Sequence, residues 1–414
     1  MLRQLKLAPF GTDNALGVIF SLMPLIKCFK KWENHLVTNL KKIKIGIDAK
    51  WFFEGPPSGR NVVRNLVEHI IEQNVEHEIY IFLDQRMRNL EFPFKSPLVR
   101  LIYLWGNNNL LSNLFIFPWK AWRLKLDVVI FQNFVPVLSN FRRLAIIYDV
   151  IFLSHPQYFT RKERIYLYPI KLLSRFASQI CTISQSEKNR IVSYCGIAAD
   201  KIEVMYLGVS PIFRPKHHFD AEQLQLVRQK YNLPENFLLY VGRLNERKNI
   251  LNLLKSVPML ENNDIVLILV GSYDWKMFDI NKVVRELGLE KRVQLTGFVS
   301  DDDLPLVFSL ATLFWFVSYE EGFGLPPLES MAAGVPVIVS DRSSLPEVCG
   351  DAGNYADPDS PRSIADAIDR LLKDKNLYEE KRRLGLNRAQ KFKWWNSSEK
   401  LMQSAVSIAE RGKK

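Results

Sequence analysis

Residues 318–336 read SYEEGFGLPPLESMAAGVP, and they follow directly on the apolar run 311–317. A short apolar run bounded by turn residues predicts a buried strand. Pro326 and Pro327 suit the first turn of a helix, and Gly334 suits the position just past its end. The stretch therefore predicts a strand, a glycine-containing loop and a helix in that order, which is the repeating unit of a parallel α/β sheet.

The loop of this stretch has the features of an anion-binding site. The backbone amides of Gly322, Phe323 and Gly324 approach a helix N-terminus, where phosphate groups commonly bind. Two acids, Glu321 and Glu329, flank these residues. Because a carboxylate repels phosphate, we expect the acids to accept hydrogen bonds from hydroxyl groups such as those of a sugar. A structural turn with a helix-capping acid is the alternative, which the glycines and prolines disfavour.

A second loop with ligand-binding features follows the apolar run 237–241, in the sequence VGRLNERKN (241–249). The run leads straight into Gly242 and Arg243, and Lys248 follows shortly before a predicted helix. Arginine can bind a phosphate as a fork and lysine as a point charge. We therefore expect both cations to reach one phosphate group, at the same sheet edge as Glu321.

The same alternation of short apolar runs and helical stretches extends in both directions along the chain. We expect strands at 43–47, 78–83, 99–104, 127–131, 144–148, 179–183 and 202–205, and again at 237–241, 265–270, 293–296, 311–317 and 335–340. Helices are expected at 61–73 and 398–410, among others. The stretch LGVSPIFRPKHHF (207–219) has no periodicity and is the best candidate linker. The chain therefore predicts two doubly wound parallel sheets, with ligands at the carboxyl ends of the strands.

The composition excludes several classes of protein. The 414 residues are 47% hydrophobic and 12% aromatic, which excludes global disorder. The four cysteines (28, 181, 195 and 349) form no C-x-x-C pair, so they fit a reducing compartment, and we expect the cytoplasm. Of the net charge of +12, residues 1–220 carry +13. This excess suggests contact with an anionic membrane; nucleic acid is not expected, because no aromatic–basic interleaving supports it.

Residues 1–42 differ from the rest of the chain. Their apolar stretch 16–26 is too short to span a membrane, which takes about 20 apolar residues, and Pro24 interrupts it. Because lysines follow, one interpretation is a segment that lies in a membrane surface. A disordered extension or a misassigned start codon is the open alternative.

Several motifs together resemble the retaining nucleotide-sugar glycosyltransferases of family four, also called group 1, which have the GT-B fold. The strongest are GRLNERKN (242–249), TGFVSDDDL (296–304) and EEGFGLPPLESMAAGVPV (320–337). Weaker ones are KIGIDAK (44–50), TISQSEKNRI (182–191) and YLGVSPIFRP (206–215). The resemblance covers residues 43–400 and implies two Rossmann-like domains that face each other across a cleft.

The resemblance also implies a division of the chain into domains. We expect an N-terminal extension (1–42), an acceptor-binding domain (43–210), a linker (211–222), a nucleotide-sugar-binding domain (223–390) and a C-terminal helix that crosses back onto the first domain (391–414).

Roles for individual residues follow from the resemblance. Arg243 and Lys248 match the pair that binds and stabilises the donor diphosphate, and Glu321 matches the carboxylate that contacts the transferred sugar. Residues 322–324 match amides for the sugar and the β-phosphate. The remaining donor-side matches are Glu329 for the ribose, Phe298 and Val299 along the nucleobase, Gly59 near the phosphate, and Gly242 and Leu325 in the two loops.

One position departs from the family pattern. Members often carry His-Asp where this chain has Tyr148 and Asp149. A tyrosine can donate a hydrogen bond to a sugar, but it is no general base near pH 7. His155 lies seven residues further on, so Tyr148, Asp149 and His155 are our acceptor-side candidates.

The activity that the resemblance implies is sugar transfer with retention, from a GDP- or UDP-linked donor to a saccharide or lipid-linked acceptor, in cell-surface polysaccharide synthesis. Mannose and glucose are the sugars we expect. No cofactor is expected, and no metal either: Asp301, Asp302 and Asp303 precede a predicted helix, whose first turn carboxylates stabilise. A catalytically silent GT-B binding subunit and a GT-B epimerase are the alternatives.

Overall fold

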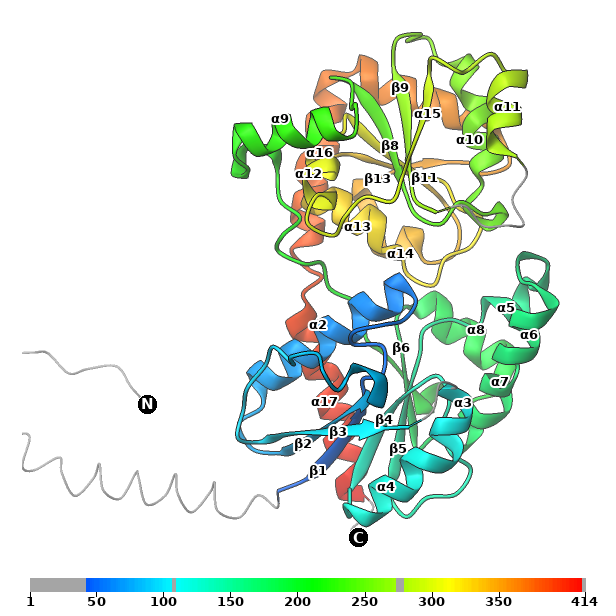
Figure 1. Ribbon diagram of the computed structural model, residues 1–414. Coiled ribbons are helices and arrows are strands. Elements are labelled where there is room, and N and C mark those ends of the chain that lie inside the picture. The colour runs from blue at the N-terminus through cyan, green and yellow to red at the C-terminus, as the bar shows by residue number, and fades with distance from the viewer. Residues whose placement is uncertain (1–41, 106–108, 273–278, 412–414) are drawn as a thin grey trace, which may run out of the picture. The chain divides into compact units, whose positions relative to one another are not determined.

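The computed structural model describes residues 42–105, 109–272 and 279–411, and its strands form two wholly parallel sheets (Figure 1). In the described part of the chain, the first sheet has seven strands in the order β3-β2-β1-β4-β5-β6-β7, and the second has six in the order β10-β9-β8-β11-β12-β13. By their internal contacts, residues 44–414 form one unit.

The strands of the first sheet are β1 (Lys44–Asp48), β2 (Glu78–Asp84), β3 (Val99–Leu104), β4 (Val128–Gln132), β5 (Arg142–Ile147), β6 (Gln179–Thr182) and β7 (Ile202–Val204). Those of the second are β8 (Phe237–Val241), β9 (Val266–Val270), β10 (Val293–Gly297), β11 (Leu313–Phe316), β12 (Val337–Ser340) and β13 (Gly353–Ala356). Central strands such as β4 and β11 are buried at every residue, because a parallel sheet is covered on both faces.

The helices are α2 (Pro57–Gln73), α3 (Asn109–Leu111), α4 (Phe117–Arg123), α5 (Ile151–Ser154), α6 (Arg161–Leu167), α7 (Pro169–Leu173), α8 (Gln185–Cys195), α9 (Ala221–Lys230), α10 (Ile250–Ser256), α11 (Ile280–Glu286), α12 (Leu304–Leu310), α13 (Leu325–Ala332), α14 (Leu345–Cys349), α15 (Pro361–Lys373), α16 (Lys375–Ala389) and α17 (Trp394–Arg411). Of the helices in the described residues, none is both long and apolar enough to cross a membrane.

The strand orders place each predicted ligand loop at a topological switch point. In the second sheet, β8 lies between β9 and β11, so the connections from β8 and β11 leave toward opposite sides of the sheet. The crevice between two such strands, at their carboxyl ends, is where open α/β sheets bind ligands. In the first sheet, β1 and β4 make the corresponding switch point.

The deciding stretch folds as its residues predict. β11 leads into a loop that ends at Gly324, and α13 follows with prolines in its first turn. Gly324 has φ +108°, a left-handed value that favours glycine, and Gly334 has φ +73° just past the helix end. The amide of Gly334 donates to the carbonyl of Met331, which closes the last turn.

The C-terminal helix α17 returns to the first sheet, where it contacts α2, β4, β5 and β6 (Figure 1). The crossing is close, because a Cβ on Gly208 would lie 2.1 Å from the backbone nitrogen of Trp394. Next to it, the amide of Val209 donates to the carbonyl of Phe392 over 3.1 Å. Only glycine therefore fits at position 208 where the two segments pass each other.

The predicted fold class, two Rossmann-like parallel sheets with a C-terminal helix that returns to the first, is confirmed. The prediction missed β13, whose sequence GNYA contains no apolar run. Two helices begin one turn earlier than expected, α2 at Pro57 and α17 at Trp394. The domain boundaries stay a prediction, and residues 1–41 of the proposed membrane or disordered extension lie outside the described residues.

Candidate active site

The loops after β8 and β11 meet in a buried cluster of charges. The Lys248 ammonium donates to Glu321 Oε1 over 2.5 Å, and the Arg247 guanidinium lies 3.2 Å from Glu321 Oε2. Both cations come from η7 (Glu246–Lys248), whose N-cap Asn245 accepts a hydrogen bond from the Lys248 amide. Two cations therefore share one carboxylate, and the cluster keeps a net positive charge.

The electrostatics of the cluster follow from burial and pairing. Burial lowers the pKa of Lys248 to about 8, although the negative charge of Glu321 acts to raise it. Burial alone would raise the pKa of Glu321, but the charges of Lys248 and Arg247 outweigh it and hold that pKa below its usual value. Glu321 is thus an anion at neutral pH, and it orients both cations before any ligand binds.

Arg243 and Arg247 have different places in the site: Arg247 pairs with Glu321, whereas the side chain of Arg243 is exposed. The Arg243 side chain is exposed and, within the described residues, enters no hydrogen bond or ion pair. It still lies close enough to Lys248 to lower the pKa of that ammonium. Sequence reasoning missed Arg247, although its position beside Lys248 in NERKN was the available signal. The structure joins Lys248 to Glu321 and leaves Arg243 open to a ligand.

The glycine loop is held against residues of the first sheet. The Ser184 hydroxyl donates to the Gly322 carbonyl over 2.7 Å. A Cβ on Gly322 would lie 3.3 Å from Asp149 Cβ and from the Tyr148 carbonyl oxygen, so a larger residue would push the two loops apart. The Phe323 ring is buried and packs on Phe392, so this residue can offer a ligand only its backbone.

Glu329 is the second predicted acid, and the structure separates it from the cationic cluster. It lies buried in α13, where burial and then the charge of Asp301 raise the pKa of its carboxyl to about 8. None of the described residues forms a hydrogen bond or ion pair with this side chain. A carboxyl that is neutral at pH 7 can donate and accept hydrogen bonds without repelling a phosphate.

The other donor-side candidates lie in four places. Phe298 follows β10 and is 79% exposed, whereas its neighbour Val299 is buried. Leu325 is the first residue of α13, and Gly242, at φ +153°, is the first residue after β8. Gly59 was expected in the loop before the first helix. It lies instead inside the first turn of α2, because that helix begins at Pro57.

All three acceptor-side candidates have defined partners. The Tyr148 hydroxyl donates to Gln132 Oε1 over 2.5 Å, and burial followed by the charge of Asp48 raises the pKa of that hydroxyl. His155 Nε2 lies 3.5 Å from a carboxylate oxygen of Glu320, the residue before Glu321. His155 thus turns toward the loop after β11. Asp149 caps the next segment by accepting from the Ile151 amide.

A polar network at the switch point of the first sheet was missed by the sequence analysis. Asp48, at the end of β1, lies 3.3 Å from the buried Lys50 ammonium and accepts from Asn113 Nδ2 over 3.0 Å. Burial lowers the pKa of Lys50, although Asp48 opposes the shift. Gln132 Nε2 donates to the Asp48 carbonyl and so joins the network to Tyr148. KIGIDAK contained the signal, in charged residues directly after a buried strand.

Asp303, the last of the three consecutive aspartates, is the N-cap residue of α12, as the sequence predicts. Asp303 precedes α12, yet its carboxylate makes no cap hydrogen bond; it accepts instead from Lys230 Nζ and from the Tyr231 hydroxyl. The carboxylate binds these partners rather than the backbone amides of α12, because a hydrogen bond to the charged Lys230 ammonium is stronger than one to an amide. Asp301 forms an exposed ion pair with Arg60 of α2, at 3.0 Å. The absence of a metal from the reaction stays a prediction.

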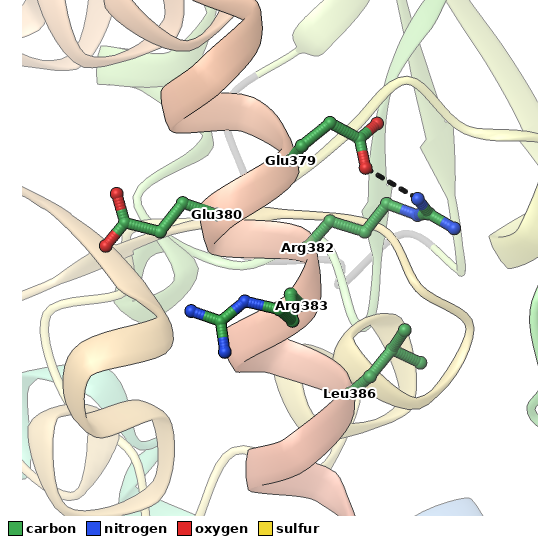
Figure 2. Close-up of a pocket in the computed structure, with 5 residues that line it drawn as sticks. All are labelled: Glu379, Glu380, Arg382, Arg383 and Leu386. Atoms are coloured by element: carbon green, nitrogen blue, oxygen red, sulfur yellow. Dashed lines mark hydrogen bonds and ion pairs between the residues drawn. The ribbon is translucent and has the colours of Figure 1, made fainter.

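The surface of the protein also has hollows outside these loops. One lies on α16 and is lined by Glu379, Glu380, Arg382, Arg383 and Leu386, all from one helix (Figure 2). Glu379 and Arg382 pair at 2.6 Å, and the side chains diverge from the helix rather than converge on one point (Figure 2). No predicted site residue lines this hollow, so we assign it no ligand.

Two family models match the chain, one on each sheet. The model of glycosyltransferase family 4 matches residues 59–212, and the model of glycosyl transferases group 1 matches residues 225–391. Together they cover β4 of the first switch point, both strands of the second (β8 and β11) and all the charged residues of the cluster; β1 lies before the matched residues.

Among individual proteins, the chain is similar to O-antigen chain mannosyltransferase B of Escherichia coli, with 34% identity over 261 residues, 62% of this chain and 68% of that relative. A similar solved structure is sucrose-phosphate synthase from Thermosynechococcus elongatus, with a TM-score of 0.68 and 22% identity over 89% of this chain and 99% of that one. Another is HepE of Anabaena with UDP and glucose, with a TM-score of 0.67 and 17% identity over 88% of this chain and 100% of that one. These two structures share the fold.

Proposed function

Because this chain belongs to the group 1 glycosyltransferases of family four, we propose that it transfers mannose from a nucleotide-linked donor to a saccharide or lipid-linked acceptor. The reaction would serve the synthesis of a cell-surface polysaccharide, as the name of its O-antigen relative suggests. The proposal places the protein in the cytoplasm; its three described cysteines, Cys181, Cys195 and Cys349, are free and buried.

The observation that carries this proposal is the preorganised cluster at the switch point of the second sheet. Lys248 and Arg247 are fixed on Glu321, and Arg243, which has no partner among the described residues, lies on the same loop. Cations that need no rearrangement stabilise the negative charge that develops on a leaving group. A nucleoside diphosphate is such a leaving group, and the loop after β8 carries three cations, Arg243, Arg247 and Lys248.

The proposed mechanism retains the configuration of the sugar. The acceptor hydroxyl attacks C1 on the face from which the diphosphate departs, the C1–O bond to phosphate breaks, and a phosphate oxygen takes the hydroxyl proton. No base from the protein is then needed, which fits a site where Tyr148 stands and burial keeps its hydroxyl protonated. Glu321 would orient the sugar hydroxyls and the two cations, and no metal takes part in this scheme.

The names of similar proteins support the proposed sugar and nucleobase of the donor. The relative from Escherichia coli is named a mannosyltransferase, which supports mannose, whereas HepE was solved with UDP and glucose. GDP- and UDP-linked donors are therefore both to be tested. We assign the exposed Phe298 ring to the nucleobase, and the neutral carboxyl of Glu329 to the ribose hydroxyls.

Donor binding can be tested by thermal stability of the protein with a panel of nucleoside diphosphates and nucleotide sugars, without added metal. We expect one base family to raise the melting temperature, since ligand at 100 times its Kd stabilises by about 2.7 kcal/mol. Glu329→Ala should abolish the ligand-induced shift, and the control Glu286→Ala, at an exposed position on α11, should keep it. No shift with any ligand would overturn the proposal in favour of a silent binding subunit.

The pH dependence of binding tests the electrostatic part of the proposal. With a pKa of about 8 for both groups, raising the pH through 8 removes the charge of Lys248 and adds a negative charge to Glu329. Both changes oppose an anionic ligand, so we expect the affinity for GDP or UDP to fall above pH 8, by up to about tenfold per pH unit for each group.

The measurement is calorimetric titration across this pH range. Lys248→Arg, whose charge persists, and Glu329→Gln, which stays neutral, should each flatten part of the dependence. An affinity that is constant from pH 7 to 9 in the unaltered protein would show that neither Lys248 nor Glu329 lies close to the bound nucleotide.

A further inference from the structure

One helical stretch of the first domain exposes an apolar face. It comprises α3, the π-helical segment η2 (Ser112–Ile116) and α4, and thus runs from Asn109 to Arg123. Its exposed large side chains are Leu111, Phe115, Trp119 and Trp122, with exposed fractions of 54%, 68%, 53% and 58%. Their spacing of four, four and three places them on one side of the helix. These four are the only exposed residues between 109 and 122, so the exposed side of this stretch is wholly apolar. A surface helix normally turns polar residues to water.

The opposite side of the stretch is firmly held in the protein. Phe117 is fully buried and its ring stacks on Phe82 with 4.0 Å between centroids. Asn113, also fully buried, donates to Asp48 and to the carbonyl of Phe134. The exposed side chains are thus presented by a rigid element, and no rearrangement is needed to expose them.

The charge along this stretch of the sequence has a single sign. From Phe92 to Leu126 the sequence contains no aspartate or glutamate, but it contains Lys120, Arg123 and Lys125 at the end of the stretch. Arg123 and Lys125 are exposed, and the Arg123 guanidinium lies 5.1 Å from the centre of the Trp119 ring. Tryptophans beside lysines and arginines are typical of surfaces that lie in the headgroup region of a bilayer.

A second element continues the surface. Helices α6 and α7 expose Ile165, Tyr168 and Leu172, and α6 also exposes three basic residues and one acid, Arg161, Lys162, Arg164 and Glu163. The two elements are neighbours, because the Tyr166 ring of α6 packs edge-on against Phe134, whose carbonyl Asn113 binds (Figure 1).

We propose that the face made by Leu111, Phe115, Trp119 and Trp122, with its flanking cations, is a docking surface for an anionic lipid bilayer. The aromatic rings would enter the boundary between headgroups and acyl chains, and Lys120, Arg123 and Lys125 would contact lipid phosphates. We choose an anionic bilayer as the partner of this face because the cations beside the aromatic rings complement its negative charge. This surface is distinct from residues 1–42, and the inference does not depend on the proposed sugar transfer.

Flotation of the full chain with phosphatidylcholine vesicles, with and without phosphatidylglycerol, tests the proposal. We expect binding that is stronger with phosphatidylglycerol and that falls by about tenfold or more in Trp119→Ser/Trp122→Ser. Lys120→Glu/Arg123→Glu should remove the preference for the anionic lipid. Trp395→Ser is the matched control, because Trp395 is 48% exposed but lies on α17, and it should bind as the unaltered chain does.

Three outcomes would overturn the proposal. Vesicle binding that persists in the double tryptophan variant but disappears when residues 2–41 are deleted would place the contact in the N-terminal segment. A change of oligomeric state in that variant, with vesicle binding unchanged, would make the face an interface between two copies. An equal loss in Trp395→Ser would show a general effect on folding. The shift in melting temperature with nucleotides should persist in all these variants, so failure here leaves the donor site untouched.

Discussion

Replacing Arg243 by alanine should lower kcat/KM for donor turnover by about 10³-fold or more, which is the effect of removing an arginine that stabilises a departing phosphate. The stability of the protein should not change, because the Arg243 side chain is exposed and has no partner among the described residues. A loss of activity without a loss of stability is the signature of a side chain that acts only on the ligand.

Two comparisons make this result specific. Arg383→Ala removes an exposed arginine from α16 (Figure 2), a helix that carries no predicted site residue, and should leave turnover unchanged. Arg243→Lys keeps the charge but loses the planar fork, so we expect partial activity. Turnover by Arg243→Ala within a few-fold of the unaltered enzyme would remove Arg243 from the diphosphate site.

Replacing Glu321 by glutamine should damage both stability and activity. The change leaves Lys248 and Arg247 buried without their shared counter-ion, and breaking a buried ion pair in this way costs about 3–5 kcal/mol. It also releases the two cations from their fixed positions, so turnover should fall by at least about 10²-fold. Denaturant unfolding and donor turnover measure the two effects.

The matched control is Glu246→Gln, which removes the same charge from an exposed position in η7. We expect it to change stability by less than about 0.5 kcal/mol. Equal effects of the two substitutions would mean that Glu321 contributes only to the net charge of the loop. The pKa of Lys248 should also fall further in Glu321→Gln, because the carboxylate that opposes its deprotonation is gone.

The donor side of the site could be predicted well because its signals are local. A strand, a glycine loop and a helix follow one another between residues 311 and 334, and each step has its own residue type: apolar side chains, then glycines, then prolines. Parallel strands then bring the carboxyl ends of β8 and β11 together, so that Glu321 and Lys248 meet although 73 positions separate them.

What the sequence did not reveal depends on contacts between distant segments. Whether Arg243 or Arg247 pairs with Glu321 is decided by the path of a short loop, and both arginines fit the pattern equally. The network of Asp48, Lys50 and Asn113 joins β1 to a helix more than 60 residues later. In the same way, nothing in the run LLSNLFIFPWKAW (110–122) separates its buried residues from the four that the structure exposes, Leu111, Phe115, Trp119 and Trp122.

The central claim, that the cluster around Glu321 serves sugar transfer from a nucleotide donor, is tested most directly by turnover of the unaltered chain. GDP-mannose, UDP-glucose and UDP-N-acetylglucosamine, each labelled at C1, would be incubated with the protein and lipid-linked saccharides from a bacterial membrane, without added metal. The account predicts that one donor loses its nucleoside diphosphate and that the label appears in a saccharide with the anomeric configuration of the donor. Folded protein that releases no diphosphate from any of the three donors, or a product of inverted configuration, would contradict it.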